Sequence, residues 1–157
     1  MFQFGGSQQA VSTGGVDQAS KIIEEFFRKN KIDPNAQRVK TDPSEICWTI
    51  TRGSSVNYIF LTKIGDIDTV RVASPILFLP QENLLPLYRR CLELNFMVLD
   101  CAFAINKDMI VVVSERPILG LDATEFENMM RQVSYIADTY DNQLADEFHA
   151  RLYTQGR

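Results

Sequence analysis

The stretch NLLPLYRRCLELNFMVLDCAFAINKDMIVVVSERP, residues 83–117, decides the fold that we expect for this chain. Its first part predicts an amphipathic helix, because apolar side chains recur at helical spacing at Leu84, Leu87, Tyr88, Cys91 and Leu92. We expect this helix to end at Asn95 in a left-handed cap. The second part, residues 101–114, predicts two β-strands joined by a tight turn at 106–108.

Both faces of this predicted hairpin are apolar. A two-residue turn places Cys101, Phe103, Ile105, Ile110 and Val112 on one face, and Ala102, Ala104, Met109, Val111 and Val113 on the other. Because both faces must be covered, one faces the core and the second packs against a helix or another subunit. We predict a homodimer with an interface formed by Tyr88, Cys91, Leu92, Ala102, Ala104, Val111 and Val113. The alternative is that the last helix of the same chain covers this surface.

The upstream part of the chain predicts one helix and three strands. Residues 16–30 have the helical pattern of apolar side chains, and residues 45–76 are typical of three antiparallel strands with turns at 52–55 and 64–67. Turns with an even number of residues fix which side chains share a face. The predicted core face carries Ile46, Trp48, Ile50, Ile59, Leu61, Val70 and Val72. The opposite face carries Cys47, Thr49, Thr51, Tyr58, Phe60, Thr62, Thr69, Arg71 and Ala73.

That opposite face is amphipathic, with two aromatic side chains, Tyr58 and Phe60, among threonines and one cation, Arg71. A half-solvated face of this kind is common in antiparallel sheets and needs no function. It is also typical of a surface that binds an extended peptide. Tyr58, Phe60 and Arg71 are therefore our candidate partner-binding residues. A three-residue loop at either turn would exchange the two faces.

The last predicted element is a long helix over residues 122–148, which begins with a capping box at Asp122 and Glu125. The elements follow the order α-β-β-β-α-β-β-α. Hairpins separated by helices predict an α+β fold with three helices and an antiparallel sheet of about five strands. We expect a single α+β domain over residues 16–150, preceded by a flexible leader at 1–15 and followed by a tail at 151–157.

Length and charge exclude several classes of function. The chain has 157 residues, enough for one domain, and a formal net charge of −4. An acidic balance disfavours nucleic acid and anionic membranes as partners. No apolar run approaches the roughly 20 residues of a membrane span. Three cysteines without C-x-x-C spacing are typical of reduced thiols. We therefore expect a cytoplasmic protein that binds neither nucleic acid nor a membrane.

The residue pattern contains no catalytic or metal-binding constellation. Nucleophilic catalysis needs a base within hydrogen-bond reach, and we expect the one histidine, His149, to be an exposed residue at the end of the last helix. A zinc site needs about four Cys or His ligands at set spacings, which the cysteines and His149 lack. Asp138, Asp141 and Asp146 indicate a solvated helix face. The prediction is no enzyme, no cofactor and no metal.

The succession Leu92-Glu-Leu-Asn-Phe96, then Phe103-Ala-Ile, residues 110–113 and a long helix ending near Tyr140-Asp141 resembles the YbjN family. Members of that family share a fold with type III secretion chaperones. The resemblance covers about residues 16–148 and is strongest over 84–145. It implies a cytosolic, non-enzymatic α+β domain that often forms homodimers. In the chaperone relatives, exposed apolar patches hold an extended partner segment, and no catalytic residues exist to transfer to this chain.

The leading hypothesis is therefore a protein-binding module: a homodimeric, chaperone-like or regulatory adaptor that holds a segment of an unidentified protein. One alternative is a small-molecule sensor or enzyme with a pocket that is not visible in the sequence. Another is a structural subunit of a larger assembly. An apolar groove over Tyr58 and Phe60 favours the first hypothesis, and a deep polar pocket with converging ionisable groups favours the sensor or enzyme.

Overall fold

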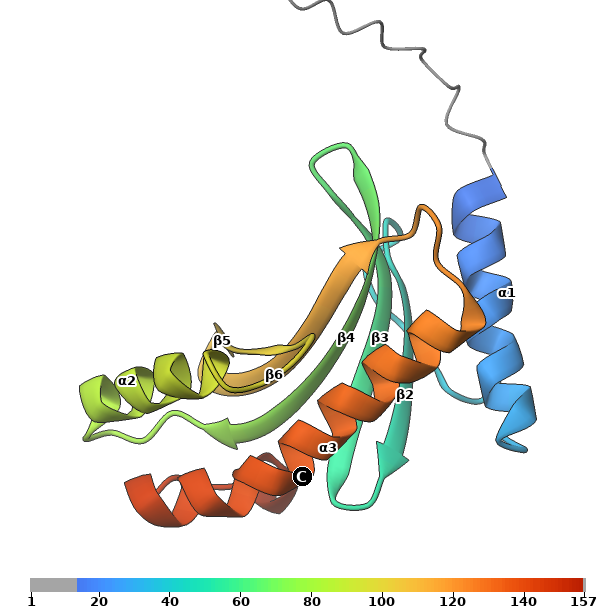
Figure 1. Ribbon diagram of the computed structural model, residues 1–157. Coiled ribbons are helices and arrows are strands. Elements are labelled where there is room, and N and C mark those ends of the chain that lie inside the picture. The colour runs from blue at the N-terminus through green and yellow to red at the C-terminus, as the bar shows by residue number, and fades with distance from the viewer. Residues whose placement is uncertain (1–13, 157) are drawn as a thin grey trace, which may run out of the picture.

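A six-stranded antiparallel sheet carries three α-helices on one of its faces (Figure 1). The computed structural model describes residues 14–156, so most of the predicted leader, residues 1–13, and residue 157 of the predicted tail lie outside the described residues. The described elements are α1 (Gly14–Lys29), β1 (Arg38–Val39), β2 (Ile46–Arg52), β3 (Ser55–Ile64), β4 (Ile67–Phe78), α2 (Leu84–Asn95), β5 (Ala102–Asn106), β6 (Met109–Pro117), α3 (Ala123–Phe148) and the 3₁₀ helix η1 (Tyr153–Gly156).

The strand order in the sheet is β1-β2-β3-β4-β6-β5, and all neighbouring strands are antiparallel. The α+β fold and the predicted order of its elements are thus confirmed. The one additional strand is β1, which pairs with β2 over two residues. Two residues are too few for an alternating pattern, which is why the sequence did not predict β1.

Three two-residue turns set the register of the sheet. The closing pairs are Arg52 with Ser55, Ile64 with Ile67, and Asn106 with Met109. Gly53 and Gly65 have φ values of 60° and 59°, the left-handed conformation that such tight hairpins require. The predicted core face is confirmed, because Trp48, Ile50, Ile59, Leu61, Val70 and Val72 are all buried and Ile46 packs against them.

The long helix α3 covers this core face diagonally (Figure 1). Its predicted capping box is confirmed: the Glu125 N–H donates to Asp122 Oδ1 at 2.8 Å, and the Asp122 N–H donates to Glu125 Oε2 at 3.2 Å. The buried side of α3 includes Phe126, Met130 and Val133. α1 packs beside it, where the rings of Phe26 and Phe126 meet edge to face at 5.3 Å.

The position of α2 is set by its last residue, and the predicted left-handed cap at Asn95 is wrong. Phe96 follows it in a right-handed helical conformation. The Asn95 side chain instead reaches the neighbouring strand, where Oδ1 accepts from the Phe103 N–H at 2.7 Å and Nδ2 donates to the Phe103 carbonyl at 3.2 Å. An amide side chain can replace the backbone of a pairing strand in this way. Asn95 therefore fastens α2 to the outer edge of β5.

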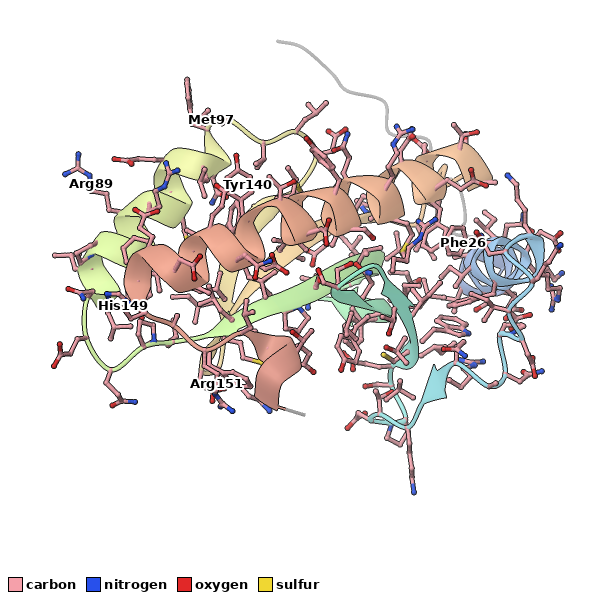
Figure 2. The ribbon with its side chains drawn as sticks, turned by 90° about the horizontal axis from the view of Figure 1, so that it is seen from below. Phe26, Arg89, Met97, Tyr140, His149 and Arg151 are labelled. Carbon is pink, nitrogen blue, oxygen red and sulfur yellow. The ribbon has the colours of Figure 1, made fainter. Side chains whose placement is uncertain are left out.

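The chain after α3 returns to the sheet. His149 adopts a left-handed conformation with φ 52°, which ends α3 and redirects the backbone. Leu152 then forms an isolated antiparallel bridge with Leu77 of β4. Figure 2 shows Arg151 and η1 on the side of the sheet opposite to α3. Residues 151–156, which belong to the predicted tail, thus lie against β4.

Candidate functional site

The sheet face turned away from α1, α2 and α3, which we call the outer face, carries most of the predicted site residues. Cross-strand pairing places three rows of side chains on it. The first row is Cys47, Phe60, Arg71 and Glu115; the second is Thr49, Tyr58, Ala73, Val113 and Ala102; the third is Pro75, Val111 and Ala104. The structure therefore brings the candidate partner-binding residues and four of the candidate dimer residues onto one continuous surface.

An aromatic pair stands near the middle of the outer face. The rings of Tyr58 and Phe60 are stacked, with their centroids 6.3 Å apart and their planes 22° apart. Both side chains are half-buried. α1, α2 and α3 lie on the other side of the sheet, whereas η1 lies on the same side as this pair, and the hydroxyl oxygens of Tyr58 and Tyr153 are 2.8 Å apart.

Arg71 has its charge partner within the chain. Its Nε donates to Glu115 of β6, the residue paired with it across the two strands. Both side chains are about one-third exposed, so the pair sits at the solvent boundary of the outer face. Sequence reasoning missed Glu115 because the partner lies 44 residues away and only the β4–β6 register brings the two together. If Arg71 binds a partner, the partner therefore has to break or share the Arg71–Glu115 ion pair.

The candidate dimer residues on α2 lie on the other side of the sheet. Cys91 is buried at 6% exposure and Tyr88 packs against the core, whereas Leu92 is 69% exposed. The predicted dimer set thus divides into a helix part and an outer-face part, separated by the thickness of the sheet. α3 covers the face with Phe103, Ile110 and Val112, not the outer-face part. Within the outer-face part, Val111 is only 5% exposed, so it is already buried within the chain and does not offer the exposed surface that was predicted.

The end of α2 exposes further apolar side chains that the sequence analysis did not select. We call these residues the apolar rim: Leu92, Phe96 (95% exposed), Met97, Leu99 and, on the adjacent strand β5, Ile105. A signal was present in the sequence, because residues 96–99 form an apolar run in what was expected to be a connection. Such a run is unusual for a solvated loop, and contiguous exposed apolar surface marks interaction sites.

The cysteine thiols lack the features of nucleophiles. Burial raises the pKa of Cys47, Cys91 and Cys101 to about 11, so each thiol is protonated at neutral pH. His149 is exposed, as predicted, and caps α3 rather than lying beside any of the three. Among the described residues, no cluster of three or more His, Cys, Asp or Glu side chains has the arrangement of a metal site.

Two open depressions on the surface carry ionisable side chains in their linings. One of about 690 Å³ lies where β5, β6 and α3 begin or end; its lining includes Arg116 and Glu125, which form an ion pair with each other. Another of about 570 Å³ lies between the end of β4, the start of α2 and His149. The lining of this second depression includes four ionisable side chains, Glu82, Asp108, His149 and Arg151, and no group of metal ligands is found among the described residues.

The fold is similar to that of type III secretion chaperone structures. The chain superposes on a chain of the ExsC–ExsE complex with a TM-score of 0.62 and 10% identity, over 82% of this chain and 94% of that one. A chain of the HopA1–SchA chaperone–effector complex gives 0.58 and 10%, over 85% and 99%. The Yersinia pestis type III secretion chaperone SycH, in complex with a stable fragment of YscM2, gives 0.50 and 18%, over 76% and 97%.

At the level of sequence, neither a protein-family model nor a curated protein matches this chain. The similarity is therefore one of fold. In residues 14–156, none of the helices combines the length and the apolar character needed to cross a membrane.

Proposed function

We propose that this chain is a non-enzymatic protein-binding module of the chaperone-like or regulatory adaptor type, which holds an extended segment of a partner protein. The observation that carries the proposal is the outer face, where a stacked aromatic pair and a row of small apolar side chains lie on a sheet surface that α1, α2 and α3 leave uncovered. Complexes with partner proteins among the structures of similar fold support this direction. We also propose a relationship to the YbjN family and a cytoplasmic location.

Tyr58 and Phe60 are the proposed centre of the partner surface. Aromatic side chains on a sheet provide large contact area at low cost in conformational entropy, which suits recognition of an extended chain. The neighbouring Ala73 and Val113 are small enough to let a partner backbone approach the sheet closely. The competing explanation is a solvated face without function, which antiparallel sheets commonly have.

The test of this surface is the double variant Tyr58→Ser plus Phe60→Ser, used as bait in affinity capture from native cytosol with mass spectrometry. We expect the fold to persist by circular dichroism and the co-purifying partner to fall at least tenfold. A matched control on the same face is Thr49→Ser plus Thr62→Ser, which should capture as the parent chain does. Equal capture by both variants contradicts the proposal, and an unfolded double variant shows that the aromatic pair belongs to the core.

We further propose that the chain forms a homodimer through the exposed side of α2 and the edge of β5. Leu92, Phe96 and Met97 are between 69% and 95% exposed, more apolar surface than one helix end of a monomer usually leaves in water. A two-fold axis beside α2 would cover this surface with the same surface of a second copy. Tyr88 and Cys91 support the helix from its buried side.

Light scattering at micromolar concentration tests whether the chain dimerises, and two single variants show which surface forms the dimer interface. Leu92→Glu places a charge on the exposed side of α2, and we expect it to give a monomer because a buried unpaired charge is costly. Ala104→Glu makes the same chemical change on the outer face and splits the dimer only if that face takes part. A stable monomer mass for the parent chain overturns the dimer.

A further inference from the structure

Residues 151–156, which we call the strap, occupy an open edge of β4. The pairing of β3 with β4 ends at Tyr58 and Ala73. Beyond that point β4 pairs with β6, and the register shifts between Pro75 and Leu77. The strap fills the side that β3 leaves. The Phe78 N–H donates to the Arg151 carbonyl at 2.9 Å, and Leu152 bridges Leu77. The strap therefore adds a short piece of strand to this edge.

Two side chains of the strap recognise the same aromatic ring. The Arg151 guanidinium lies 4.1 Å from the centre of the Phe78 ring, within the range of a cation–π contact. The Tyr153 ring centre is 5.8 Å from that of Phe78, and its hydroxyl oxygen is 2.8 Å from that of Tyr58. Arg151 and Tyr153, which flank Leu152 in the chain, thus both contact Phe78, and Tyr153 is also the first residue of η1.

The surroundings of Arg151 favour a basic residue. The depression of about 570 Å³ beside it is lined by residues of the β4–α2 connection and of the β5–β6 turn, and two carboxylates, Glu82 and Asp108, are among them. Acidic groups around a site raise the local concentration of a positively charged segment. This site thus has three recognisable elements: an edge for a backbone, an aromatic ring, and an acidic rim.

The strap is partly exposed to solvent. Besides its side-chain contacts with Phe78 and Tyr58 it shares the Phe78–Arg151 backbone hydrogen bond and the Leu77–Leu152 bridge with β4, while Arg151 is exposed and Leu152 and Tyr153 are half-exposed. A segment held within its own chain has an effective concentration in the millimolar range, which lets weak contacts keep it in place. A partner segment with the same chemistry and more contacts can therefore displace it.

We propose that this edge is a strand-addition site for an extended partner segment with a basic–apolar–aromatic sequence, and that the strap is its internal competitor. The inference rests on the proposed protein-binding function and names the chemistry of the segment that is bound. It extends the partner surface from Tyr58 to Phe78 and the edge of β4. The chain's own Arg151-Leu152-Tyr153 shows which sequence this edge accepts.

The probe for this site is a fluorescein-labelled peptide, Ala-Arg-Leu-Tyr-Thr-Gln, with the sequence of residues 150–155. It is titrated against the full parent chain and against the variant Leu152→Ser plus Tyr153→Ser, which weakens the strap and leaves β4 unchanged. When a competitor occupies nine-tenths of the sites, the apparent affinity falls tenfold. We expect the peptide to bind the variant at least tenfold more tightly than the parent chain.

Controls separate recognition of the sequence from general stickiness. The same peptide with Ser in place of Tyr, or with Ala in place of Arg, should bind the variant at least fivefold more weakly. Phe78→Ser added to the variant should remove the binding, because it deletes the ring that both side chains contact. Should the double variant fail to fold by circular dichroism, Tyr153→Ser alone is titrated instead, with the same expected direction.

A folded variant that binds no peptide, or binds it only as tightly as the parent chain does, overturns the inference. The outcome is distinguishable from failure of the proposed function. A chain that captures a partner through Tyr58 and Phe60 but binds no strap peptide keeps its function as a binding module and loses the strand-addition site. If the peptide binds but partner capture does not depend on Tyr58 and Phe60, the result supports the strand-addition site and contradicts the proposed partner surface.

Discussion

Replacing Asn95 by Ala should weaken the attachment of the end of α2 to the edge of the sheet. The side chain makes two hydrogen bonds, at 2.7 and 3.2 Å, to the N–H and C=O of Phe103 in the edge strand β5. Each such bond contributes about 0.5–1.5 kcal/mol net, which gives about 1–3 kcal/mol for the pair. Alanine recovers a few tenths of a kcal/mol through its higher helix propensity. We therefore expect a net loss of about 1–2 kcal/mol in the free energy of unfolding.

Urea denaturation measures this loss as a lower midpoint at unchanged slope. In a domain of this size it corresponds to a decrease of about 2–8 °C in Tm. The matched control is Asn128→Ala on α3, which removes an exposed amide that accepts one bond from Arg131 at 2.8 Å and should cost less than about 0.5 kcal/mol. If the two variants are equally stable, Asn95 does not fasten α2, and the geometry that presents the apolar rim needs another explanation.

Two further predictions concern His149 and the three cysteines. His149 has a φ of 52°, a left-handed conformation that glycine adopts without strain. In urea denaturation His149→Gly should therefore be neutral or stabilising, and His149→Ala should be about 1 kcal/mol less stable than the Gly variant. Equal stability of the two variants contradicts a left-handed cap. Burial raises the thiol pKa of the three cysteines from 9.0 to about 11, so iodoacetamide should alkylate the folded chain slowly at pH 8 and faster toward pH 11. In the unfolded chain the thiols ionise near pH 9, whereas in the folded chain they ionise only near pH 11. The stability that the buried, protonated thiols contribute is therefore fully present below pH 9 and is lost as the pH rises through 11, which a series of urea titrations measures.

Local patterns predicted the sheet well because its register depends on short-range chemistry. Gly53 and Gly65 supply the left-handed conformations of two tight turns, and each turn of even length fixes the alternation of every residue that follows it. The burial of Trp48 and Ile59 and the exposure pattern around Tyr58 follow from these turns. The capping box at Asp122 was predictable for the same reason, since its two hydrogen bonds join residues only three positions apart.

The parts that the sequence did not predict depend on contacts between distant residues. Arg71 pairs with Glu115 across 44 residues, and Asn95 bonds a strand rather than ending its own helix in a left-handed cap. Residues 151–156 have no periodicity, so nothing local indicated that they return to β4. Leu152 and Tyr153 were a faint signal, because two adjacent large apolar residues are unusual in a solvated tail.

The outer face changes character along the sheet, and this gradient bears on how a partner binds. At the β2–β3 end, Thr49 and Thr62 are polar enough to face water without a binding partner. At the other end, Pro75, Val111 and Ala104 form an apolar row, and this row reaches β5, the strand whose edge carries the exposed Ile105 and the apolar rim of α2. Val111 in this row is only 5% exposed, so the exposed apolar surface at this end of the sheet is that of the apolar rim.

A partner that wraps around the edge of β5 would contact the outer face and the apolar rim together. In that case Leu92→Glu should weaken partner capture as well as dimerisation, although Leu92 and Tyr58 lie on opposite sides of the sheet. If the two surfaces serve different partners, Leu92→Glu should split the dimer and leave capture unchanged, and the Tyr58 and Phe60 double variant should do the reverse. The measurement is partner capture by each variant and by the combined variant. Separate partners give no loss of capture for Leu92→Glu, whereas a shared partner gives a loss for each variant, and the two losses add in the combined variant because the sites are too far apart to touch.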